Sequence, residues 1–245
     1  MKNYLKLFTG IFMLLTSVLS AQNQFQADTI KTSEGNLVIT FIKHATLMFQ
    51  FKGMVIHVDP VSMYADYAKM PKADIILVTH EHGDHFDPAT INLLKKKDTE
   101  IILTKTCEEK LKEGTVMNNG DEKIVKGIKV DAVPAYNIIH KRDNGEPFHP
   151  KGIGNGYVIT FGDKKVYIAG DTEDIPEMKN LKNIYIAFLP MNLPYTMTPG
   201  MVASAADMFK PKILYPYHYG NTNVNDLLKL MKNRKYCEVR IREMN

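Results

Sequence analysis

The sequence predicts an α/β (α+β) fold in which two β-sheets pack together and helices lie outside them. Short apolar runs rich in β-branched residues open each half of the chain, separated by tight turns. Helical and strand patterns alternate after the strands of the second half, and no repeat occurs at a fixed period of 20–50 residues. With 245 residues, 44% hydrophobic and 24% charged, the chain suits one substantial globular domain.

The first 21 residues have the pattern of a secretory signal peptide. Lys2 and Lys6 precede an apolar run from Leu7 to Leu19, and small residues follow at positions 20 and 21. A membrane span needs roughly 20 apolar residues, so this run predicts cleavage rather than an uncleaved anchor. We therefore expect an exported protein, periplasmic or extracellular, with no stable membrane span after cleavage.

The charge and the cysteines limit the partners. Residues 1–21 contain two lysines and no acidic residue, so their removal lowers the net charge from +4 to +2. Nucleic-acid binding needs a stronger basic stripe, and we expect a small-molecule substrate and no nucleic acid. An oxidising compartment permits a disulfide between Cys107 and Cys237, but their isolated positions favour neither a disulfide nor a metal site. The oligomeric state is left open.

The domain is expected to span residues 37–245, after a polar linker at 22–36. Its first half predicts strands, with a turn at Lys52-Gly53 and a helix that begins after Asp87-Pro88, where Asp is a good N-cap. A short helix is expected from Thr106. The expected strands are 37–42, 45–51, 54–59, 75–78, 101–104 and a meander over 123–135.

The second half begins with a long segment, residues 136–156, rich in Gly, Pro and polar residues. Long ordered loops in compact domains tend to be functional, so we expect it to contribute to a site. Strands at 157–161 and 165–170 come next. Alternating helices and strands are then expected at 174–181, 184–190, 199–209, 212–217, 224–233 and 237–243.

The strongest chemical signal lies just past the apolar run 75–78. Three histidines and one aspartate fall within six residues, His80-Glu81-His82-Gly83-Asp84-His85. Imidazole nitrogens and carboxylate oxygens suit a borderline ion such as zinc. In a turn, neighbouring side chains can point to different corners of a site, so His80 and His82 would hold one ion and Asp84 and His85 another.

This segment resembles the signature of the metallo-β-lactamase superfamily, and the resemblance extends from about Leu37 to the end. The Gly170-Asp171-Thr172 turn and His218 follow in the superfamily's order. Residues Lys43-His44-Ala45, Asp59-Pro60, the AYN…FHPKG loop and Tyr195–Thr198 are most similar to the branch of bacterial ascorbate-phosphate lactonase and N-acyl-phosphatidylethanolamine phospholipase D. The resemblance implies a four-layer αβ/βα sandwich with a metal site at one edge.

The resemblance also implies roles for matched positions. Asp171 would bridge two divalent ions, most simply Zn²⁺, although Mn²⁺ or Fe would also fit, and His218 would complete the second ion's shell. Asp84, Asp171 and His218 would take part in catalysis. His44 and Asp59 would orient the ligands from behind. The alternation of its own strand, rather than the resemblance, leads us to expect that His57 faces a polar patch of the sheet. Tyr195, Lys151 and Asn137 are the candidates for substrate binding, and the further candidates for the substrate rim are Arg142, Tyr217 and Tyr219.

The sequence departs from the common pattern at the third histidine of the first ion. Many superfamily members place it after the strand that ends here at Pro134-Ala135, and our alignment puts Asn137 there. His149, bracketed by Pro147 and Pro150, is the favoured replacement, and His140 is the alternative. A first site with two histidines, completed by water or Asn137, and a single-metal site also stay open.

The expected reaction is metal-dependent hydrolysis, because two ions lower the pKa of a shared water and provide a bridging hydroxide near neutral pH. The expected substrate is small and anionic, with a lactone or a phosphodiester at near parity. A bridging aspartate is typical of lactonases, thioesterases and phosphodiesterases, so a β-lactamase ranks low. A non-catalytic or single-metal protein that retains the fold is the alternative from another class.

Overall fold

The computed structural model describes residues 25–244. The predicted signal peptide, residues 1–21, lies outside the described residues. Within the described part of the chain, no helix combines the length and the apolar character needed to cross a membrane.

Two mixed seven-stranded sheets form the centre of the fold, and each runs through its strands in chain order. Each sheet is antiparallel over its first four strands and parallel over the rest. The first sheet contains β1 (Gln26–Thr32), β2 (Gly35–Lys43), β3 (Thr46–Phe51), β4 (Met54–Val58), β5 (Ile75–Leu77), β6 (Glu100–Leu103) and β7 (Thr115–Val116). The second contains β8 (Glu122–Val125), β9 (Ile128–Ala135), β10 (Gly154–Phe161), β11 (Lys164–Ile168), β12 (Ile184–Pro190), β13 (Ile213–Tyr217) and β14 (Glu238–Val239).

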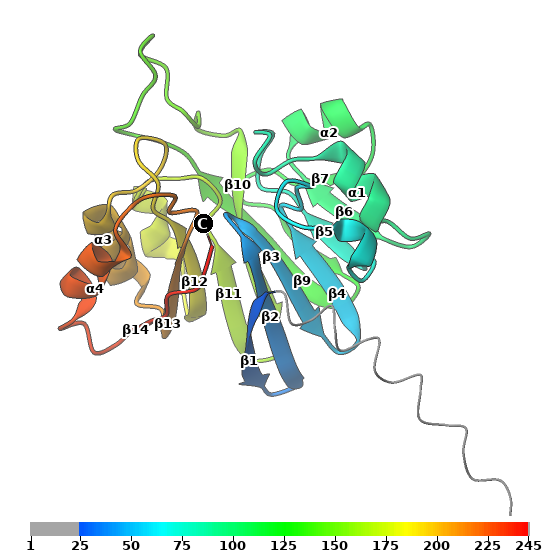
Figure 1. Ribbon diagram of the computed structural model, residues 1–245, viewed down its shortest axis with the longest axis horizontal. Coiled ribbons are helices and arrows are strands. Elements are labelled where there is room, and N and C mark those ends of the chain that lie inside the picture. The colour runs from blue at the N-terminus through cyan, green and yellow to red at the C-terminus, as the bar shows by residue number, and fades with distance from the viewer. Residues whose placement is uncertain (1–24, 245) are drawn as a thin grey trace, which may run out of the picture.

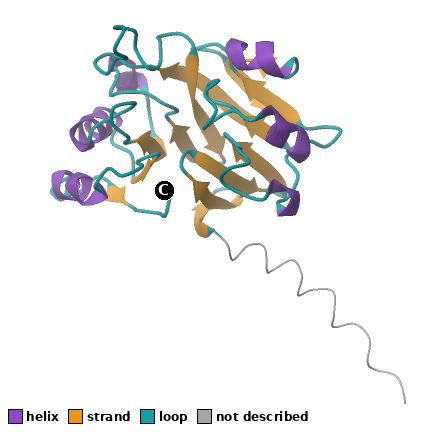
Figure 2. Ribbon diagram, turned by 45° about the horizontal axis from the view of Figure 1, so that its top comes forward, coloured by secondary structure: helices purple, strands orange, loops and turns teal. Residues whose placement is uncertain are grey.

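Helices cover the outer sides of the two sheets (Figures 1 and 2). The helices beside the first sheet are η2 (Tyr67–Lys69), α1 (Pro88–Leu94) and α2 (Lys105–Leu111), and those beside the second are η3 (Pro176–Asn180), α3 (Pro199–Phe209) and α4 (Val224–Met231). Helix α1 begins as predicted, because the Asp87 carboxylate accepts hydrogen bonds from the backbone N–H groups of Ala89 and Thr90. The chain therefore has the four-layer αβ/βα sandwich that was expected.

Side-chain alternation along the strands divides the core into two layers. Ile75, Leu77 and Ile102 point into the large layer between the sheets. Their neighbours Ile76 and Ile101 point the other way and pack with Ile91, Leu94 and Cys107 of α1 and α2. Because successive strand side chains face opposite sides, an apolar run without alternation is the pattern of a strand buried on both faces.

The structure differs from the sequence prediction at three places. Residues 26–32, expected within a linker, form strand β1, which pairs with β2 over its whole length. The segment 174–181 contains a 3₁₀ helix rather than an α-helix, and the last strand is limited to Glu238–Val239. The cysteines agree with the prediction: Cys107 is buried within α2, and both it and Cys237 are free thiols.

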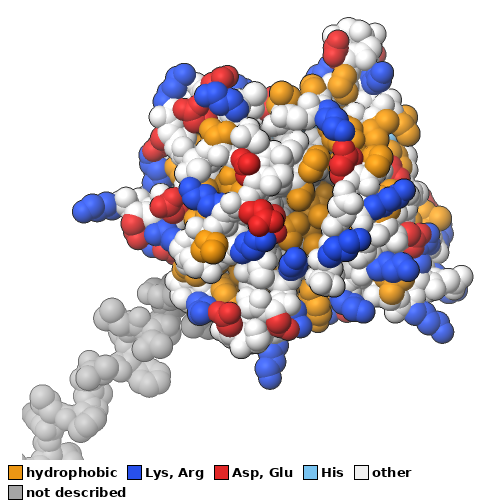
Figure 3. Space-filling model, turned by 180° about the vertical axis from the view of Figure 1, so that it is seen from behind, with side chains coloured by type: hydrophobic (Ala, Val, Ile, Leu, Met, Phe, Trp, Pro, Cys, Tyr) orange, Lys and Arg blue, Asp and Glu red, His pale blue; other side chains and the backbone are white. Residues whose placement is uncertain are grey.

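Charges of both signs share the surface. Figure 3 shows lysine and arginine side chains interspersed with acidic ones, with a stripe of hydrophobic side chains between them. The two signs of charge are therefore mixed on this face of the molecule.

Candidate metal centre

Histidine and aspartate side chains converge at one edge of the paired sheets, where several strands end. His80, His82, Asp84 and His85 follow β5, and Asp171 follows β11. The other contributors come from the β2–β3 turn (His44), the end of β4 (Asp59), the β9–β10 connection (His149) and the end of β13 (His218). Segments far apart in the sequence thus meet because strand ends from both sheets lie at this edge.

The first group consists of His80, His82 and His149, with one potential ligand atom from each within 4.8 Å of the others. The ring centroids are separated by 4.7 Å for His80–His82, 4.9 Å for His82–His149 and 5.1 Å for His80–His149. Three imidazoles are a donor set that divalent metal ions such as zinc use, so this group could hold one ion. Residues 136–153 therefore bring His149 to the place where the expected third histidine is missing.

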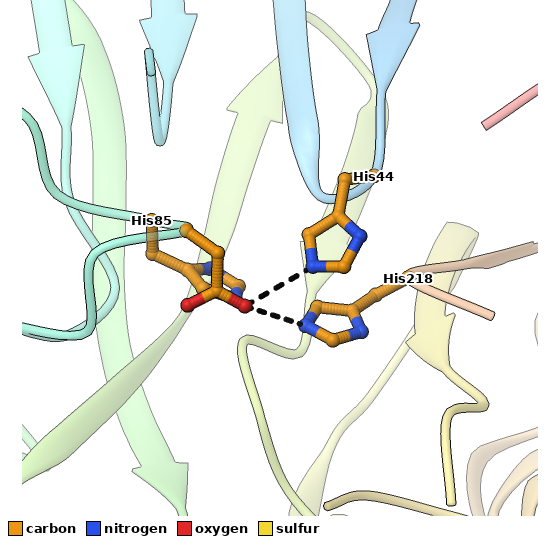
Figure 4. A group of neighbouring side chains, drawn as sticks. His44, His85 and His218 are labelled. Carbon is orange, nitrogen blue, oxygen red and sulfur yellow. Dashed lines mark hydrogen bonds and ion pairs between the residues drawn. The ribbon is translucent and has the colours of Figure 1, made fainter. Parts of the chain in front are cut away.

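The second group consists of Asp84, His85, His218 and His44. Figure 4 shows the imidazoles of His44, His85 and His218 around an unlabelled carboxylate, and the dashed contacts to His44 and His218 identify it as that of Asp84. The Asp84 Oδ2 atom lies 3.1 Å from His44 Nε2, 3.5 Å from His218 Nε2 and 3.8 Å from His85 Nε2. The structure thus adds His44, expected only behind the ligands, to the residues that can reach an ion here.

Asp171 lies between the two groups. Its carboxylate oxygens are 3.2 Å from His149 Nε2, 3.3 Å from His85 Nε2, 3.3 Å from His218 Nε2 and 4.0 Å from His80 Nε2. Residues from both groups therefore face one carboxylate, which is the geometry of a bridging position.

Gly170 allows Asp171 to reach this position. Its φ is +64°, in the left-handed region that favours glycine, and a Cβ atom here would lie 2.7 Å from the carbonyl oxygen of Asn155. Any side chain at this point would force the two strands apart. The packing at this turn therefore requires glycine at position 170, and this turn sets the position of Asp171.

A second buried carboxylate orients His85 from behind. Asp59, fully buried, has its Oδ2 atom 2.8 Å from His85 Nδ1, and its two oxygens accept hydrogen bonds from the N–H and hydroxyl groups of Thr79. A carboxylate on Nδ1 fixes the proton there and leaves Nε2 free for an ion. The predicted orienting role of Asp59 agrees with this contact.

The backbone is strained at three of these residues. His44, Asp59 and His218 have φ values of +56°, +47° and +46°, in a region that non-glycine residues rarely occupy. The His218 N–H donates to the carbonyl oxygen of His44, which links the two strained positions. Such strain costs about 1–3 kcal/mol per residue and gathers at functional sites.

The unpaired polar atoms test whether the donors suit a metal ion. Among the described residues, the buried atoms without a hydrogen-bond partner include Nε2 of His80, His85 and His218 and Oδ1 of Asp171. Buried polar groups are normally hydrogen-bonded, so several orphaned atoms at one edge of the sheets require other partners. Divalent cations satisfy such lone pairs on nitrogen and oxygen donors, and the residues fit the ions that the sequence predicted.

The charges of the centre influence its protonation. Burial lowers the pKa of His80 and His82, which favours the neutral imidazoles that metals require. Burial would also lower the pKa of His218, but the Asp171 and Asp84 carboxylates outweigh it and raise that pKa to about 9. For Asp171, burial opposes ionisation, but His218 and His85 prevail and hold its pKa well below the usual range.

A cavity of about 340 Å³ opens onto the centre. Its lining residues are His82, Gly83, Asp84, Arg142, Phe148, His149, Asp171, Asn192, Tyr195 and His218. Phe148 and Tyr195 pack edge to face with ring centroids 5.0 Å apart, and the Arg142 guanidinium lies 5.1 Å from the Phe148 ring centroid. One side of the cavity is therefore polar, and the other offers aromatic faces and a guanidinium.

Two residues predicted to bind substrate lie elsewhere. Lys151 is paired with Glu177, with Nζ 2.6 Å from Oε1, and its side chain covers the Tyr136 ring outside the cavity lining. Asn137 is buried behind His149, and its amide is engaged by protein groups. Of the three candidates, only Tyr195 lines the cavity, because hydrogen bonds between distant residues turn the other two away.

The remaining histidines lie apart from the centre. His140, the alternative third histidine, has its Nδ1 atom 2.7 Å from Glu173 Oε1 and belongs to none of the candidate groups. His57 is fully buried in the first sheet, with Nε2 3.1 Å from the carbonyl oxygen of Pro71. Burial lowers the pKa of His57 to about 4, so it is a neutral core residue.

Sequence reasoning missed Glu173, which is fully buried two residues after Asp171. Its carboxylate accepts hydrogen bonds from the backbone N–H groups of Ile138, Ile139 and His140. A carboxylate with several N–H donors is a strong anchor for a loop. Its nearness to the Gly-Asp-Thr turn was the one sequence signal that pointed to it.

Comparison with known proteins agrees with this architecture. Residues 38–218 match the beta-lactamase superfamily domain. A UPF0173 metal-dependent hydrolase of Nanoarchaeum equitans is 35% identical over 188 residues, which cover 74% of this chain and 83% of that protein.

Two solved structures extend the comparison. A proposed metal-dependent hydrolase from Parabacteroides distasonis is 55% identical and superimposes with a TM-score of 0.86, over 90% of this chain and 100% of that one. Igni18, a metallo hydrolase from Ignicoccus hospitalis, is 23% identical with a TM-score of 0.70 and covers 84% and 95% of the two chains. The second likeness concerns the fold alone.

Proposed function

The chain belongs to the beta-lactamase superfamily and, within it, to the UPF0173 metal-dependent hydrolases, and we propose that it uses two divalent ions to hydrolyse an ester-type bond in a small anionic substrate. The convergence of two groups of ligand atoms on Asp171 carries this proposal. Zn²⁺ is the proposed metal because most of the donors are imidazoles.

His80, His82 and His149 would hold the first ion, Asp84, His85 and His218 the second, and Asp171 would contact both. When bound, such ions polarise the bond under attack and lower the pKa of water, so that hydroxide is available near neutral pH. We propose that the attacking hydroxide would be provided beside Asp171, where residues of both groups meet.

The chain's own residues would manage the proton. The Asp84 side chain is 40% exposed, whereas the Asp171 side chain is 3% exposed, so Asp84 is the carboxylate that a water in the cavity can reach. Asp84 would accept the proton of the attacking water on its other oxygen, Oδ1, because Oδ2 faces the imidazoles of the second group. His44 Nε2, 3.1 Å from Oδ2, would donate to this carboxylate and orient it.

Arg142 supports an anionic substrate, because it is the one lysine or arginine among the residues that line the cavity. Its guanidinium could pair with a carboxylate or phosphate oxygen while the reacting group lies near Asp171. Phe148 and Tyr195 offer apolar contact to the rest of the molecule. An anionic lactone or phosphodiester fits both sides of the cavity, and the lactonase and phospholipase D-like branch stays our proposal for the nearest activities.

The proposal is tested by metal content and turnover measured together. Wild type, His80→Ala, His82→Ala and His140→Ala would be analysed for zinc, then assayed with bis(p-nitrophenyl) phosphate and with a carboxylate-bearing lactone. We expect two ions in wild type and in the His140→Ala control, and at most one in His80→Ala or His82→Ala. Chelation should abolish hydrolysis, and added zinc should restore it. Wild type that binds no metal, or hydrolysis that survives chelation, would exclude this function.

We also propose that the protein is exported, on the basis of the sequence pattern of residues 1–21. The mature chain should then begin near Gln22. Intact mass of the protein recovered outside the cytoplasm tests this, and a soluble cytoplasmic pool that retains Met1 would contradict it.

A further inference from the structure

Asn137 is buried behind the first group of histidines, with 6% of its surface exposed, and its side chain hydrogen-bonds to three other residues. Its Oδ1 atom accepts a hydrogen bond of 2.9 Å from the backbone N–H of His149 and lies 2.6 Å from His149 Nδ1. Its Nδ2 atom donates to the carbonyl oxygen of Tyr195 at 3.0 Å and to Glu173 Oε1 at 3.1 Å. All four hydrogen-bonding positions of this amide are therefore used.

Backbone groups fix the orientation of the Asn137 amide. A backbone N–H can only donate and a carbonyl oxygen can only accept, so the atom facing His149 N must be oxygen and the atom facing Tyr195 O must be nitrogen. Because Asn137 Oδ1 is an acceptor, His149 Nδ1 must carry a proton. The ring then presents Nε2 toward Asp171, 3.2 Å away.

Glu173 secures this amide from the other side. Its Oε1 accepts from Asn137 Nδ2 and from the backbone N–H of His140, and its Oε2 accepts from the N–H groups of Ile138 and Ile139. N–H groups donate to both oxygens of Glu173, which is the arrangement of an ionised carboxylate, an acceptor at every position. The negative charge polarises the amide, which makes Oδ1 a better acceptor for His149.

We propose that Asn137 and Glu173 are positioning residues that hold His149 as the Nδ1-protonated tautomer, with Nε2 directed at the first ion. This inference rests on the proposed function. Our alignment puts Asn137 where many superfamily members have the third histidine ligand. In this chain Asn137 would not bind the ion itself but would position His149, which supplies that ligand instead. A carboxylate behind a metal-binding histidine is common, and here an amide is inserted between the two.

The first experiment uses the wild-type protein alone. Long-range ¹H–¹⁵N NMR of metal-free protein at pH 8 reports which ring nitrogen of His149 carries a proton, and the signal that disappears in His149→Ala gives the assignment. The proposal requires a proton on Nδ1. A His149 ring that is protonated only on Nε2 would overturn it, whatever the metal content.

The second experiment compares Asn137→Ala, Asn137→Asp and Asn144→Ala. Asn144 is the matched control, an exposed asparagine of the same loop that accepts only from the N–H of Glu146. Chelator competition should show about 10- to 100-fold weaker affinity for one zinc ion in Asn137→Ala and no change in the control. Asn137→Asp keeps an acceptor for His149 and should keep the Nδ1 proton, although its second oxygen would oppose Glu173.

The outcomes separate this inference from the function it rests on. Wild type that binds no zinc would remove the proposed function, while the NMR result would still decide the tautomer. Wild type that binds two ions, with equal affinities in Asn137→Ala, would overturn the positioning role and leave the function standing. A mixture of His149 tautomers in folded Asn137→Ala, corrected in Asn137→Asp, would support it.

Discussion

His85 and His149 face the same carboxylate, that of Asp171, but are supported differently. Asp59 lies directly behind His85, with 2.8 Å between Oδ2 and Nδ1, and both residues are fully buried beside strand ends of the first sheet. Behind His149 lies the neutral amide of Asn137, and the carboxylate of Glu173 is one hydrogen bond further away. The centre therefore has a sheet half, which is His85 with Asp59 behind it, and a loop half, which is His149 with Asn137 and Glu173 behind it.

Because of this difference, we expect the sheet half to be the more rigid part of the centre and the loop half to be the more adaptable part. A buried carboxylate against an imidazole raises the basicity of the ligand and resists movement. In the loop half, the same anion that polarises Asn137 also binds three backbone N–H groups, so it shapes the loop and orients the ligand together. Loops accept change more easily than sheets, and Arg142 and Phe148, which line the cavity and are proposed to meet substrate, belong to this half.

Breaking the sheet half should have the largest effect. Asp59→Ala leaves His85 and two Thr79 donors without their buried acceptor, so we expect a loss of about 3–5 kcal/mol in the free energy of unfolding. Urea unfolding of the metal-free protein measures it. Asp87→Ala is the control, because removing that helix cap should cost only about 1 kcal/mol. Equal losses in the two variants would contradict a special role for Asp59.

Removing His149, the metal ligand proposed for the loop half, should have the next largest effect. His149→Ala is expected to weaken the binding of one zinc ion by at least about 100-fold, or about 2.7 kcal/mol, since two histidines remain in the first group. His140→Ala should leave both affinities unchanged, because its ring faces Glu173. Chelator competition distinguishes the two. The reverse result would make His140 the ligand and His149 a packed residue.

Glu173→Gln should lower the free energy of unfolding by a smaller amount, because it weakens the contacts that hold the loop half. Both carboxylate oxygens accept backbone N–H groups, so an amide must place its own N–H₂ against at least one of them. An unsatisfied buried donor costs about 1–3 kcal/mol, and we expect about 2 kcal/mol in unfolding. Hydrogen exchange should accelerate at Ile138, Ile139 and His140, and the control Glu146→Gln should leave it unchanged. Unaltered protection in Glu173→Gln would show that other contacts hold the loop.

The sheet half was largely predictable from the sequence. Local patterns gave the strand before His80, the helix after Asp87 and the cluster from His80 to His85, because periodicity and capping act between near neighbours. Strand β1 was missed, since only Ile30 and Thr32 of its residues are buried and its stability comes from pairing with β2. Nothing in its polar composition distinguishes such an edge strand from a linker.

The loop half was predictable only in part. The proline-bracketed His149 was favoured as the third histidine, and the structure brings it beside His80 and His82. The contacts of Asn137 and Lys151 were not foreseen, because Glu173 and Glu177 reach them from more than 25 residues away. Hydrogen bonds at such separation leave no periodic trace in a sequence.

The smallest expected effect concerns substrate rather than metal. Arg142 is exposed, and its guanidinium lies over the Phe148 ring and donates to the Phe148 carbonyl oxygen at 3.3 Å. It belongs to neither group of candidate metal ligands, so it can pair with an anion without holding an ion itself. Exposed ion pairs contribute about 1 kcal/mol, so Arg142→Ala should raise KM for an anionic substrate about 5- to 10-fold, with kcat and zinc content unchanged. KM for an uncharged ester should not change, and Arg142→Lys, which keeps the charge but not the planar group, should lie between. A fall in kcat or in bound zinc would mean that Arg142 also shapes the loop half, and the contrast between a rigid metal site and an adaptable substrate wall would then fail at this residue.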